Sequence, residues 1–422
     1  MSRNNNETVP GFAPFDLDPV LHRGIAAAGF VEPRPIQVQT IPAALEGRDV
    51  LGLAQTGTGK TAAFALPILE RLLSGHSSGP RVLIVAPTRE LAAQISNEIL
   101  TLARFTRFKV ATVFGGVSVH RQRSALARRP EIVVACPGRL LDLMQQGLVR
   151  LDRVEMLVLD EADHMFDMGF LPDVRRILAA LPKERQNLLF SATMPGEIRN
   201  LADGILRNPH VVDVAHSKPL STIEHALYPV DQTRKLALLQ RILVEDELAS
   251  AIVFTRTKHR ARSVARKLEG AGHRAVALQG NMSQGQRERA MNGFRNRRFD
   301  VLVATDIAAR GIDVEQVSHV VNFDMPNTTD AYTHRIGRTG RSDRQGKAYT
   351  FVTDEDRYLV SQVEKRLGAS IPRREVRGIE SIPFPQGRSG NAASQPRPSQ
   401  PKGRRVAGAA RSRNRRRPRR SA

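Results

Sequence analysis

Short apolar runs alternate with helix-like stretches along this 422-residue chain, in two successive series. Runs this short and rich in β-branched or aliphatic residues are typical of strands buried on both faces of a parallel sheet. The first series occupies residues 49–53, 82–86, 132–135, 156–159 and 188–190, and the second occupies residues 251–254, 275–278, 301–304, 319–322 and 348–352. The pattern predicts two α/β domains with functional sites at the carboxyl ends of the strands.

The alternation stops near residue 215, where the sequence Ser-Lys-Pro-Leu-Ser at 217–221 is typical of a linker. Apolar residues at helical spacing over 15–30 predict a helix that ends at Gly29. The predicted parts are a flexible N-terminus (1–14), a first domain (15–214), a linker (215–224), a second domain (225–370) and a disordered Arg-rich tail (371–422).

Positive charge is concentrated at the C-terminus. The net charge is +22, and residues 381–422 contribute 12 Lys or Arg and no acidic residue, while residues 1–380 hold 52 basic and 42 acidic residues, a net +10. This end is rich in Pro, Gly, Ser and Ala, so it cannot bury enough apolar surface to offset the entropy of ordering. We predict a basic arm for a polyanion such as nucleic acid, and the alternative is a tail that only aids solubility.

The remaining composition limits the class of protein. A single cysteine, Cys136, excludes a disulfide framework and a cysteine-based zinc site. The N-terminus lacks the apolar segment of a signal peptide, and no run approaches the roughly 18 apolar residues of a membrane span. We therefore expect a soluble, cytoplasmic protein without a membrane partner.

A glycine-rich segment joins the first apolar run to a helix-like run at 62–73. It consists of Ala54, Gln55, Thr56, Gly57, Thr58, Gly59, Lys60 and Thr61. The glycines allow backbone N–H groups to turn toward an anion, Lys60 can reach terminal phosphates, and Thr61 is placed to hold Mg²⁺. The segment predicts a phosphate-binding loop, although Ala54 stands where the usual pattern has glycine. The alternative is a glycine-rich turn that caps an ordinary helix.

Acidic residues follow the run at 156–159. Asp160 can hold Mg²⁺ through water, and Glu161 can orient or deprotonate an attacking water. An acid-rich helix N-terminus is the alternative. His164 has no second ligand at helical spacing, which favours a structural or solvent-facing histidine over a metal ligand.

Two further sites are weaker on their own. Gln37 follows two prolines and offers an amide that matches the edge of adenine, but it also suits a helix cap. The segment 334–341 spaces several arginines with glycine and threonine, as an arginine finger for a γ-phosphate requires. A basic surface turn explains that segment equally well.

Together these residues resemble the DEAD-box RNA helicases over residues 15 to about 365, and the basic tail is most similar to the bacterial RhlE-type branch. The matching stretches keep the family's order: Phe15 with 33–37, then 54–61, 87–92, 115–116, 137–139, 160–163, 191–193, 253–255, 279–280, 304–306 with 309–313, and 334–341. The resemblance implies two RecA-like parallel-sheet domains in tandem, which bind ATP and Mg²⁺ between them and single-stranded RNA across both.

The resemblance also implies a role for each matching position. The catalytic positions are Lys60, Asp160, Glu161, Arg338 and Arg341, and the metal positions are Thr61 and Asp160. Nucleotide contacts are implied for Phe15, Gln37, all of Ala54, Gln55, Thr56, Gly57, Thr58, Gly59, Lys60 and Thr61, and for Gly311 and Asp313. Coupling of hydrolysis to strand separation is implied for Ser191, Thr193 and His334. RNA contacts are implied for Pro87, Thr88, Arg89, Gly115, Gly116, Gly138, Arg139, Thr255, Arg256, Gly280 and Thr305.

The implied activity is ATP-dependent unwinding of short RNA duplexes or remodelling of RNA–protein complexes, coupled to RNA-stimulated ATP hydrolysis. Sequence-independent RNA binding is expected, with ribosomal or RNA-decay complexes as candidate partners. Two departures are notable: Arg34 replaces the threonine usual between the two prolines, and Cys136 replaces the threonine usual before 137–139. The alternatives are an RNA clamp or annealing factor that acts through the tail, and a processive DNA translocase.

Overall fold

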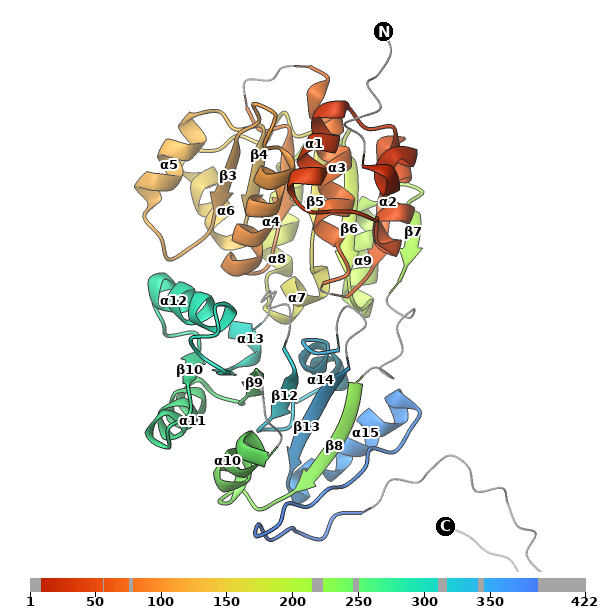
Figure 1. Cartoon of the computed structure of the whole chain (residues 1–422). Coiled ribbons are helices and arrows are strands. Elements are labelled where there is room, and N and C mark those ends of the chain that lie inside the picture. The colour runs from red at the N-terminus through yellow and green to blue at the C-terminus, as the bar shows by residue number, and fades with distance from the viewer. Residues whose placement is uncertain are drawn as a thin grey trace, which may run out of the picture. The chain divides into compact units, whose positions relative to one another are not determined.

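The computed structural model describes residues 9–55, 57–75, 79–214, 223–245, 250–309, 317–340 and 345–385. The first series of apolar runs, with two edge strands, forms a seven-stranded sheet in the half that we call lobe 1 (Figure 1). Its strands are β1 (Val50–Leu53), β2 (Val82–Val85), β3 (Val110–Val113), β4 (Ile132–Ala135), β5 (Met156–Leu159), β6 (Gln186–Ser191) and β7 (His210–Asp213). The order is β3-β4-β2-β5-β6-β1-β7, and every pair is parallel.

Helices cover both faces of the lobe 1 sheet, as parallel strands require. On β2, Val82 and Ile84 join one apolar cluster, while Leu83 and Val85 join the other. The helical elements are η2 (Pro10–Phe15), α1 (Pro19–Ala27), α2 (Pro35–Leu45), α3 (Lys60–Leu73), α4 (Arg89–Leu102), α5 (Val119–Ala127), α6 (Pro137–Gln145), α7 (Ala162–Asp167), α8 (Leu171–Ala179) and α9 (Gly196–Ile205).

The second series forms a six-stranded parallel sheet, in the half that we call lobe 2. Its strands are β8 (Ile223–Pro229), β9 (Ala251–Phe254), β10 (Ala275–Leu278), β11 (Val301–Ala304), β12 (His319–Asn322) and β13 (Gly346–Val352), in the order β10-β11-β9-β12-β13-β8. Its helices are α10 (Lys235–Glu245), α11 (Lys258–Gly270), α12 (Gln284–Arg295), α13 (Asp306–Ala309), α14 (Thr329–Ile336), η4 (Asp354–Asp356) and α15 (Arg357–Leu367). The predicted class, two parallel-sheet α/β domains in tandem, is confirmed.

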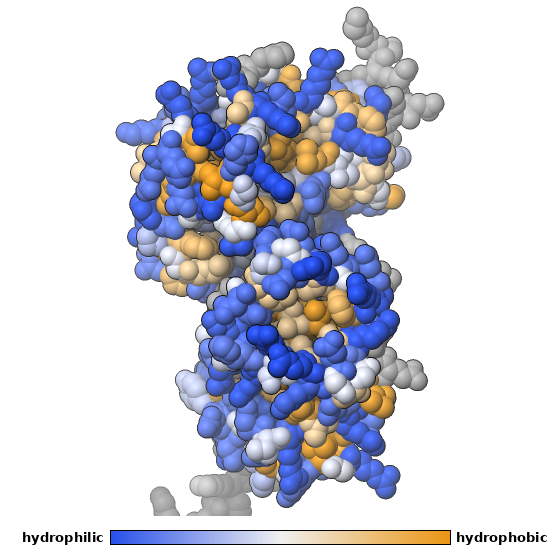
Figure 2. Space-filling model, turned by 90° about the vertical axis from the view of Figure 1, so that its left-hand side faces the viewer, coloured by the Kyte–Doolittle hydropathy of each residue, from blue (hydrophilic) through white to orange (hydrophobic). Residues whose placement is uncertain are grey.

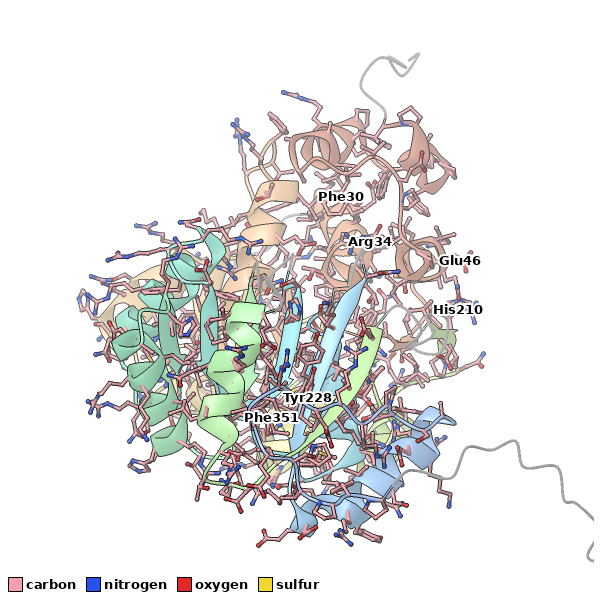
Figure 3. All side chains as sticks on the ribbon, turned by 60° about the horizontal axis from the view of Figure 1, so that its bottom comes forward. Phe30, Arg34, Glu46, His210, Tyr228 and Phe351 are labelled. Atoms are coloured by element: carbon pink, nitrogen blue, oxygen red, sulfur yellow. The ribbon has the colours of Figure 1, made fainter. Side chains whose placement is uncertain are left out.

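Contacts between aromatic side chains stabilise the pairing of β8 with β13. Tyr228 and Phe351 are register partners on these neighbouring strands, and their rings meet edge to face at 6.1 Å (Figure 3). Tyr349 meets Tyr228 in the same way at 5.3 Å. Such pairs add specific contact energy to plain apolar burial, so they favour this register over a shifted one.

The sequence patterns missed three strands, β3, β7 and β8, which all lie at or next to the ends of the sheets. On β7, only Val212 is buried, and polar residues occupy both ends of the strand. An edge strand has one neighbour and is partly exposed, so it does not need the continuous apolar run by which the inner strands are recognised. β8 also begins inside the segment predicted as linker.

Both lobes extend beyond the predicted domain limits. Phe12 is fully buried, with its ring 5.8 Å from that of Phe15 and 6.1 Å from that of Phe30, so packing starts before residue 15. After residue 370 the chain runs beside β8, where Leu227 donates to the Pro372 carbonyl and Phe384 packs against the lobe 2 core. Residues 386–422, most of the predicted tail, lie outside the described part of the chain.

Two features complete the fold. No helix among the described residues is long and apolar enough to cross a bilayer. Cys136 is buried, and burial raises the pKa of its thiol to about 12. The protonated thiol is a poor nucleophile, so Cys136 acts as a small core side chain and not as a reactive site.

Candidate functional site

The predicted phosphate loop lies between β1 and α3, at the carboxyl end of β1. Gly57 and Gly59 have φ of 82° and 91°, a conformation that favours glycine. Gly59 also faces α2 closely, because a Cβ at this position would lie 2.7 Å from Nε2 of Gln37. The loop therefore continues directly into the N-terminus of α3. Backbone N–H groups at a helix N-terminus form a favourable site for an anion.

Lys60 is buried at the first position of α3, among carboxylates. Its Nζ donates to the Ala54 carbonyl at 3.2 Å and lies 3.5 Å from Oδ1 of Asp160 at the end of β5. Burial by itself lowers the pKa of Lys60, but the carboxylates of Asp160, Glu161 and Asp163 raise it overall. Burial and the neighbouring Glu161 raise the pKa of Asp160, and Lys60 offsets this only in part. The site thus holds the charged amine of Lys60 beside the carboxylate of Asp160. A further positive charge nearby would stabilise the ionised form of this carboxylate.

Glu161 follows Asp160 in the left-handed region, with φ of 54°. A non-glycine residue held in this conformation is often found at functional sites. Its Oε2 lies 3.0 Å from Nδ1 of His164. Burial raises the pKa of Glu161, but the hydrogen bond from His164 and the charges of Lys60 and Arg338 outweigh it, so the pKa is below its ordinary value. His164 is buried rather than solvent-facing, and it positions Glu161.

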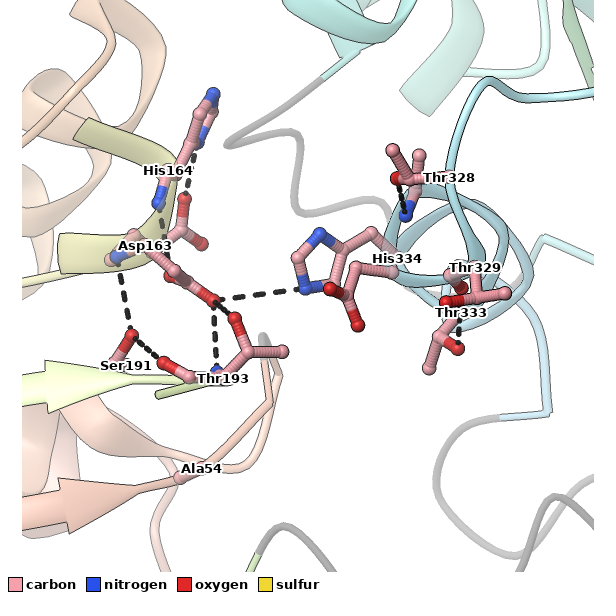
Figure 4. A network of polar contacts seen from close by, with 12 residues as sticks. Ala54, Asp163, His164, Ser191, Thr193, Thr328, Thr329, Thr333 and His334 are labelled. Carbon is pink, nitrogen blue, oxygen red and sulfur yellow. Dashed lines mark hydrogen bonds and ion pairs between the residues drawn. The ribbon is translucent and has the colours of Figure 1, made fainter. Parts of the chain in front are cut away.

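Asp163 connects three elements (Figure 4). Its Oδ2 accepts from the backbone N–H of Thr193 at 2.9 Å and from the Thr193 hydroxyl at 3.0 Å, after the end of β6. The Ser191 hydroxyl accepts from the Asp163 N–H and donates to the Thr193 carbonyl. Nε2 of His334 on α14 lies 3.8 Å from the same Oδ2. The three residues with an implied coupling role therefore meet at Asp163: Thr193 and His334 at its carboxylate, and Ser191 at its backbone N–H.

Residues of both lobes line one pocket, next to Asp163. Lys60, Glu161 and His164 from lobe 1 and His334 and Arg338 from lobe 2 line it. Arg338 is only 7% exposed, and its charge contributes to the lowered pKa of Glu161. The lining thus combines a lysine, an arginine and a carboxylate, and the two cations suit an anionic ligand.

Gln37 is fully buried at the start of α2 and already makes two hydrogen bonds. Its Oε1 accepts from the Arg34 N–H at 2.8 Å, and its Nε2 donates to the Gly59 carbonyl at 3.1 Å. Nη1 of Arg34 donates to the Gly57 carbonyl at 2.6 Å. The helix-capping alternative is thus realised in this structure, and the cap ties α2 to the phosphate loop. Phe15 is 8% exposed and packs in the lobe 1 core.

The lobe 1 residues with implied RNA contacts follow β2, β3 and β4. Arg89 extends along Gly116, where a Cβ would lie 2.0 Å from Nη1 of Arg89. Arg139 lies near the same loop, with Nη1 3.5 Å from the Val117 carbonyl. The Thr88 hydroxyl caps α4 by accepting from the Leu91 N–H. The remaining members are Pro87, Gly115 and Gly138.

The lobe 2 residues with implied RNA contacts end β9, β10 and β11. Thr255 is fully buried, and its hydroxyl donates to the Thr257 carbonyl. Arg256 and Gly280 are exposed, and Thr305 is half-buried. Arg256 and Gly280 are therefore more accessible to a ligand than the hydroxyl of Thr255. Thr56, Gly311, Asp313 and Arg341 lie outside the described residues.

The sequence patterns missed two ion pairs. Arg287 on α12 reaches Glu90 of lobe 1 at 2.6 Å, and Arg335 holds Asp306 through two hydrogen bonds of 2.5 and 2.8 Å. Both arginines are buried, so they need these partners. Sequence spacing gives no signal for such pairs, since their members are 197 and 29 residues apart.

Comparisons with known proteins place these motifs in a family context. The model of the family described as DEAD/DEAH box helicase matches residues 34–201, and the helicase conserved C-terminal domain matches residues 234–343. The DEAD-box ATP-dependent RNA helicase RhpA of Helicobacter pylori is 42% identical over 368 residues, which cover 87% of this chain and 74% of RhpA. The helicase CshA of Bacillus subtilis is 42% identical over 355 residues, which cover 84% and 72% of the two chains.

Solved structures show the same arrangement of elements. S. cerevisiae Dbp5 bound to RNA and ADP BeF3 has a TM-score of 0.77 and 32% identity, and the match covers 86% of this chain and 95% of that one. Mss116p bound to ssRNA and AMP-PNP has a TM-score of 0.79 and 27% identity, with 89% and 81% covered. These similarities extend over both lobes.

Proposed function

Because the chain belongs to the DEAD-box family of ATP-dependent RNA helicases, we propose a specific role for each part of the site between its lobes. As a member, the protein hydrolyses ATP and acts on RNA. The proposal rests on one observation: Lys60 and Glu161 of lobe 1 line the same pocket as Arg338 of lobe 2. A γ-phosphate in this pocket would contact both lobes at once, so it would hold them together.

The loop Gly57–Lys60 binds the phosphates, and Arg338 stabilises the charge that develops on the γ-phosphate. Gln37 leaves the Gly59 carbonyl to contact adenine, and Phe15 packs beside the base. We assign Ala54, Gln55, Thr58 and the undescribed Thr56, Gly311, Asp313 and Arg341 to the same nucleotide, following the family pattern.

Mg²⁺ fits the oxygen donors of this site. Asp160 supplies a carboxylate and Thr61 a hydroxyl, while no group of three or more His, Cys, Asp or Glu in the described ranges could form a metal cage. Mg²⁺ is commonly held by one or two protein oxygens together with substrate phosphates. The raised pKa of Asp160 fits a carboxylate that a cation would stabilise. When bound, Mg²⁺ would neutralise phosphate charge.

Glu161 orients the attacking water. Its lowered pKa makes it a weak base, so accepting a hydrogen bond from water suits it better than early removal of a proton. Because the ionised carboxylate only accepts hydrogen bonds, Nδ1 of His164 carries the proton between them.

RNA binding follows from closure of the lobes. The loops with Arg89, Gly116 and Arg139 in lobe 1 and with Arg256 and Gly280 in lobe 2 form a track for one strand, and their arginines and backbone groups suit phosphate and 2′-OH contacts. ATP favours the closed state, which fits a bent single strand and not a duplex. Hydrolysis lets the two lobes reopen. We place this activity in the cytoplasm, and the assignment to the RhlE-type branch stays a prediction.

The decisive experiment compares ATP hydrolysis with RNA and with DNA of the same sequence. RNA should raise kcat strongly and DNA weakly, because the proposed track uses 2′-OH contacts. Equal or greater stimulation by DNA would favour the translocase alternative and reject the RNA track.

Removal of residues 386–422 should weaken RNA binding and make it less sensitive to salt, while RNA-saturated ATP hydrolysis is retained. The segment carries +12, and each phosphate contact adds about 0.7 to the salt slope for a single strand. Fluorescence anisotropy over a salt series measures the slope. If unwinding of short duplexes is lost while core hydrolysis persists, the tail is needed for unwinding and not only for affinity.

His164→Ala should lower kcat for ATP about tenfold and leave KM for ATP nearly unchanged, because it frees the Glu161 carboxylate without touching the phosphate loop. Asn places an N–H near the position of Nδ1, whereas Gln places it near Nε2. His164→Asn should therefore retain more activity than His164→Gln. An equal loss in all three variants would mean that His164 only supports packing.

A further inference from the structure

The net charge of the described lobes comes from one segment. Residues 256–298, which contain α11, β10 and α12, hold twelve Lys or Arg and two acidic residues, a net +10. The remaining residues of 1–380 hold 40 basic and 40 acidic residues. Lobe 2 therefore has a strongly basic side at the β10 edge of its sheet, and the rest of both lobes is neutral overall.

A groove of about 500 Å³ lies on this side, along α12. Apolar side chains form its floor: Val276 from β10, Met282 and Ala290, and the ring of Phe299. The Phe299 ring packs directly against Gly293, where a larger residue would clash, because a Cβ there would lie 2.5 Å from Cε2 of Phe299. Figure 2 looks onto the side that bears α11 and α12 and shows apolar surface in lobe 2 ringed by hydrophilic surface.

The rim of the groove is polar and positively charged. Arg289 and Arg298 are exposed, and neither forms an ion pair with a carboxylate of the described chain. Three exposed carboxamides also line it: Gln286, Asn292 and Asn296. The Arg298 guanidinium also lies over the Phe299 ring, 5.8 Å from its centroid, so a bound base would share this cationic and aromatic surface. An apolar floor with a ring, carboxamides and guanidinium groups without carboxylate partners are the features that bind a nucleobase with its phosphate.

The groove begins next to the RNA-contacting loop of lobe 2. Sδ of Met282 lies 3.4 Å from the backbone N–H of Gln279, which precedes Gly280. Arg287 on the same helix is turned away and pairs with Glu90. A strand that passes over Gly280 therefore has the groove directly beside its path.

We propose that this groove binds one unpaired nucleotide of the RNA just outside the main track, with the base on the Phe299 floor and the phosphate on Arg289 and Arg298. This inference rests on the proposed RNA track. The basic C-terminal segment is a poor occupant, because it would bring +12 to a surface that is already positive. An acidic protein segment would satisfy the charges, but it would leave the carboxamides without the base edges that they match.

The test uses the full chain and single-stranded oligouridylates of about 4 to 16 nucleotides, in which one position at a time is made abasic. The groove variant is Arg289→Ala/Arg298→Ala. The matched control is Arg262→Ala/Arg266→Ala on α11, which removes the same charge from exposed positions of the same basic segment outside the groove. Phe299→Leu tests the ring without a change of charge.

In the unmodified protein, an abasic position outside the main track should weaken binding about 5- to 100-fold, as expected for one stacked base. The groove variant and Phe299→Leu should lose this sensitivity, while the control should bind more weakly at every position but keep the profile. An unchanged profile in the groove variant overturns the inference and leaves an acidic partner as the better occupant. If the unmodified protein shows no RNA-stimulated hydrolysis at all, the proposed function itself fails.

Discussion

Arg338→Ala is expected to lower kcat for RNA-stimulated ATP hydrolysis by about 10³- to 10⁵-fold, the largest effect of any single change considered. Arg338 is almost fully buried in the pocket that Lys60 and Glu161 also line, so a γ-phosphate bound there would meet a guanidinium that is shielded from bulk solvent. ATP affinity should fall much less, because the interaction strengthens in the transition state. Single-turnover hydrolysis and equilibrium binding of a fluorescent ATP analogue measure the two effects.

Two variants make this result specific. Arg338→Lys keeps the charge but not the forked donor geometry, so it should recover only part of the rate. Arg262→Ala removes an exposed arginine of α11 and should leave kcat near that of the unmodified protein. A rate for Arg338→Ala within a few fold of the control would remove Arg338 from the reaction.

Glu161→Gln should lower kcat about 10²- to 10⁴-fold while the protein still binds ATP and RNA. Gln has nearly the same shape and still accepts from Nδ1 of His164, but it lacks the charge that orients the water. The variant should therefore accumulate as a complex with ATP and RNA. Quenched-flow hydrolysis and RNA release after excess competitor would show slow turnover and slow dissociation together.

The control for Glu161→Gln is Glu184→Gln, because the Glu184 side chain is 87% exposed and pairs with Arg207 on the surface of lobe 1. It should behave as the unmodified protein. Near-normal hydrolysis by Glu161→Gln would show that another group orients the water, and Asp163 would then be tested next, since it lies in the same pocket.

Local sequence was sufficient to predict those parts of the site whose residues are consecutive in the chain. The loop from Ala54 to Thr61 and the acids from Asp160 to Asp163 each follow an inner strand, and inner strands are recognisable because burial on both faces requires continuous apolar residues. The edge strands β3 and β7 were not recognisable for the converse reason: one side of each is free of a neighbour, so polar residues are tolerated there.

His164 shows where residue type alone is insufficient. Its sequence context favoured a structural or solvent-facing side chain, and the structure shows it buried with Nδ1 3.0 Å from the Glu161 carboxylate. The alternative roles of Gln37 were likewise open until the structure placed its amide between the Arg34 N–H and the Gly59 carbonyl.

The sequence by itself determined the two-domain α/β class, the family resemblance and the chemistry available at each loop, because strand burial and phosphate-loop geometry depend on residues close together in the chain. The tertiary structure decided which of those loops meet. The contact of His334 with Asp163, the pair of Arg287 with Glu90 and the pocket shared by Lys60 and Arg338 join residues more than 150 positions apart. No local pattern encodes such distances, since they follow from how two separately folded sheets present their strand ends.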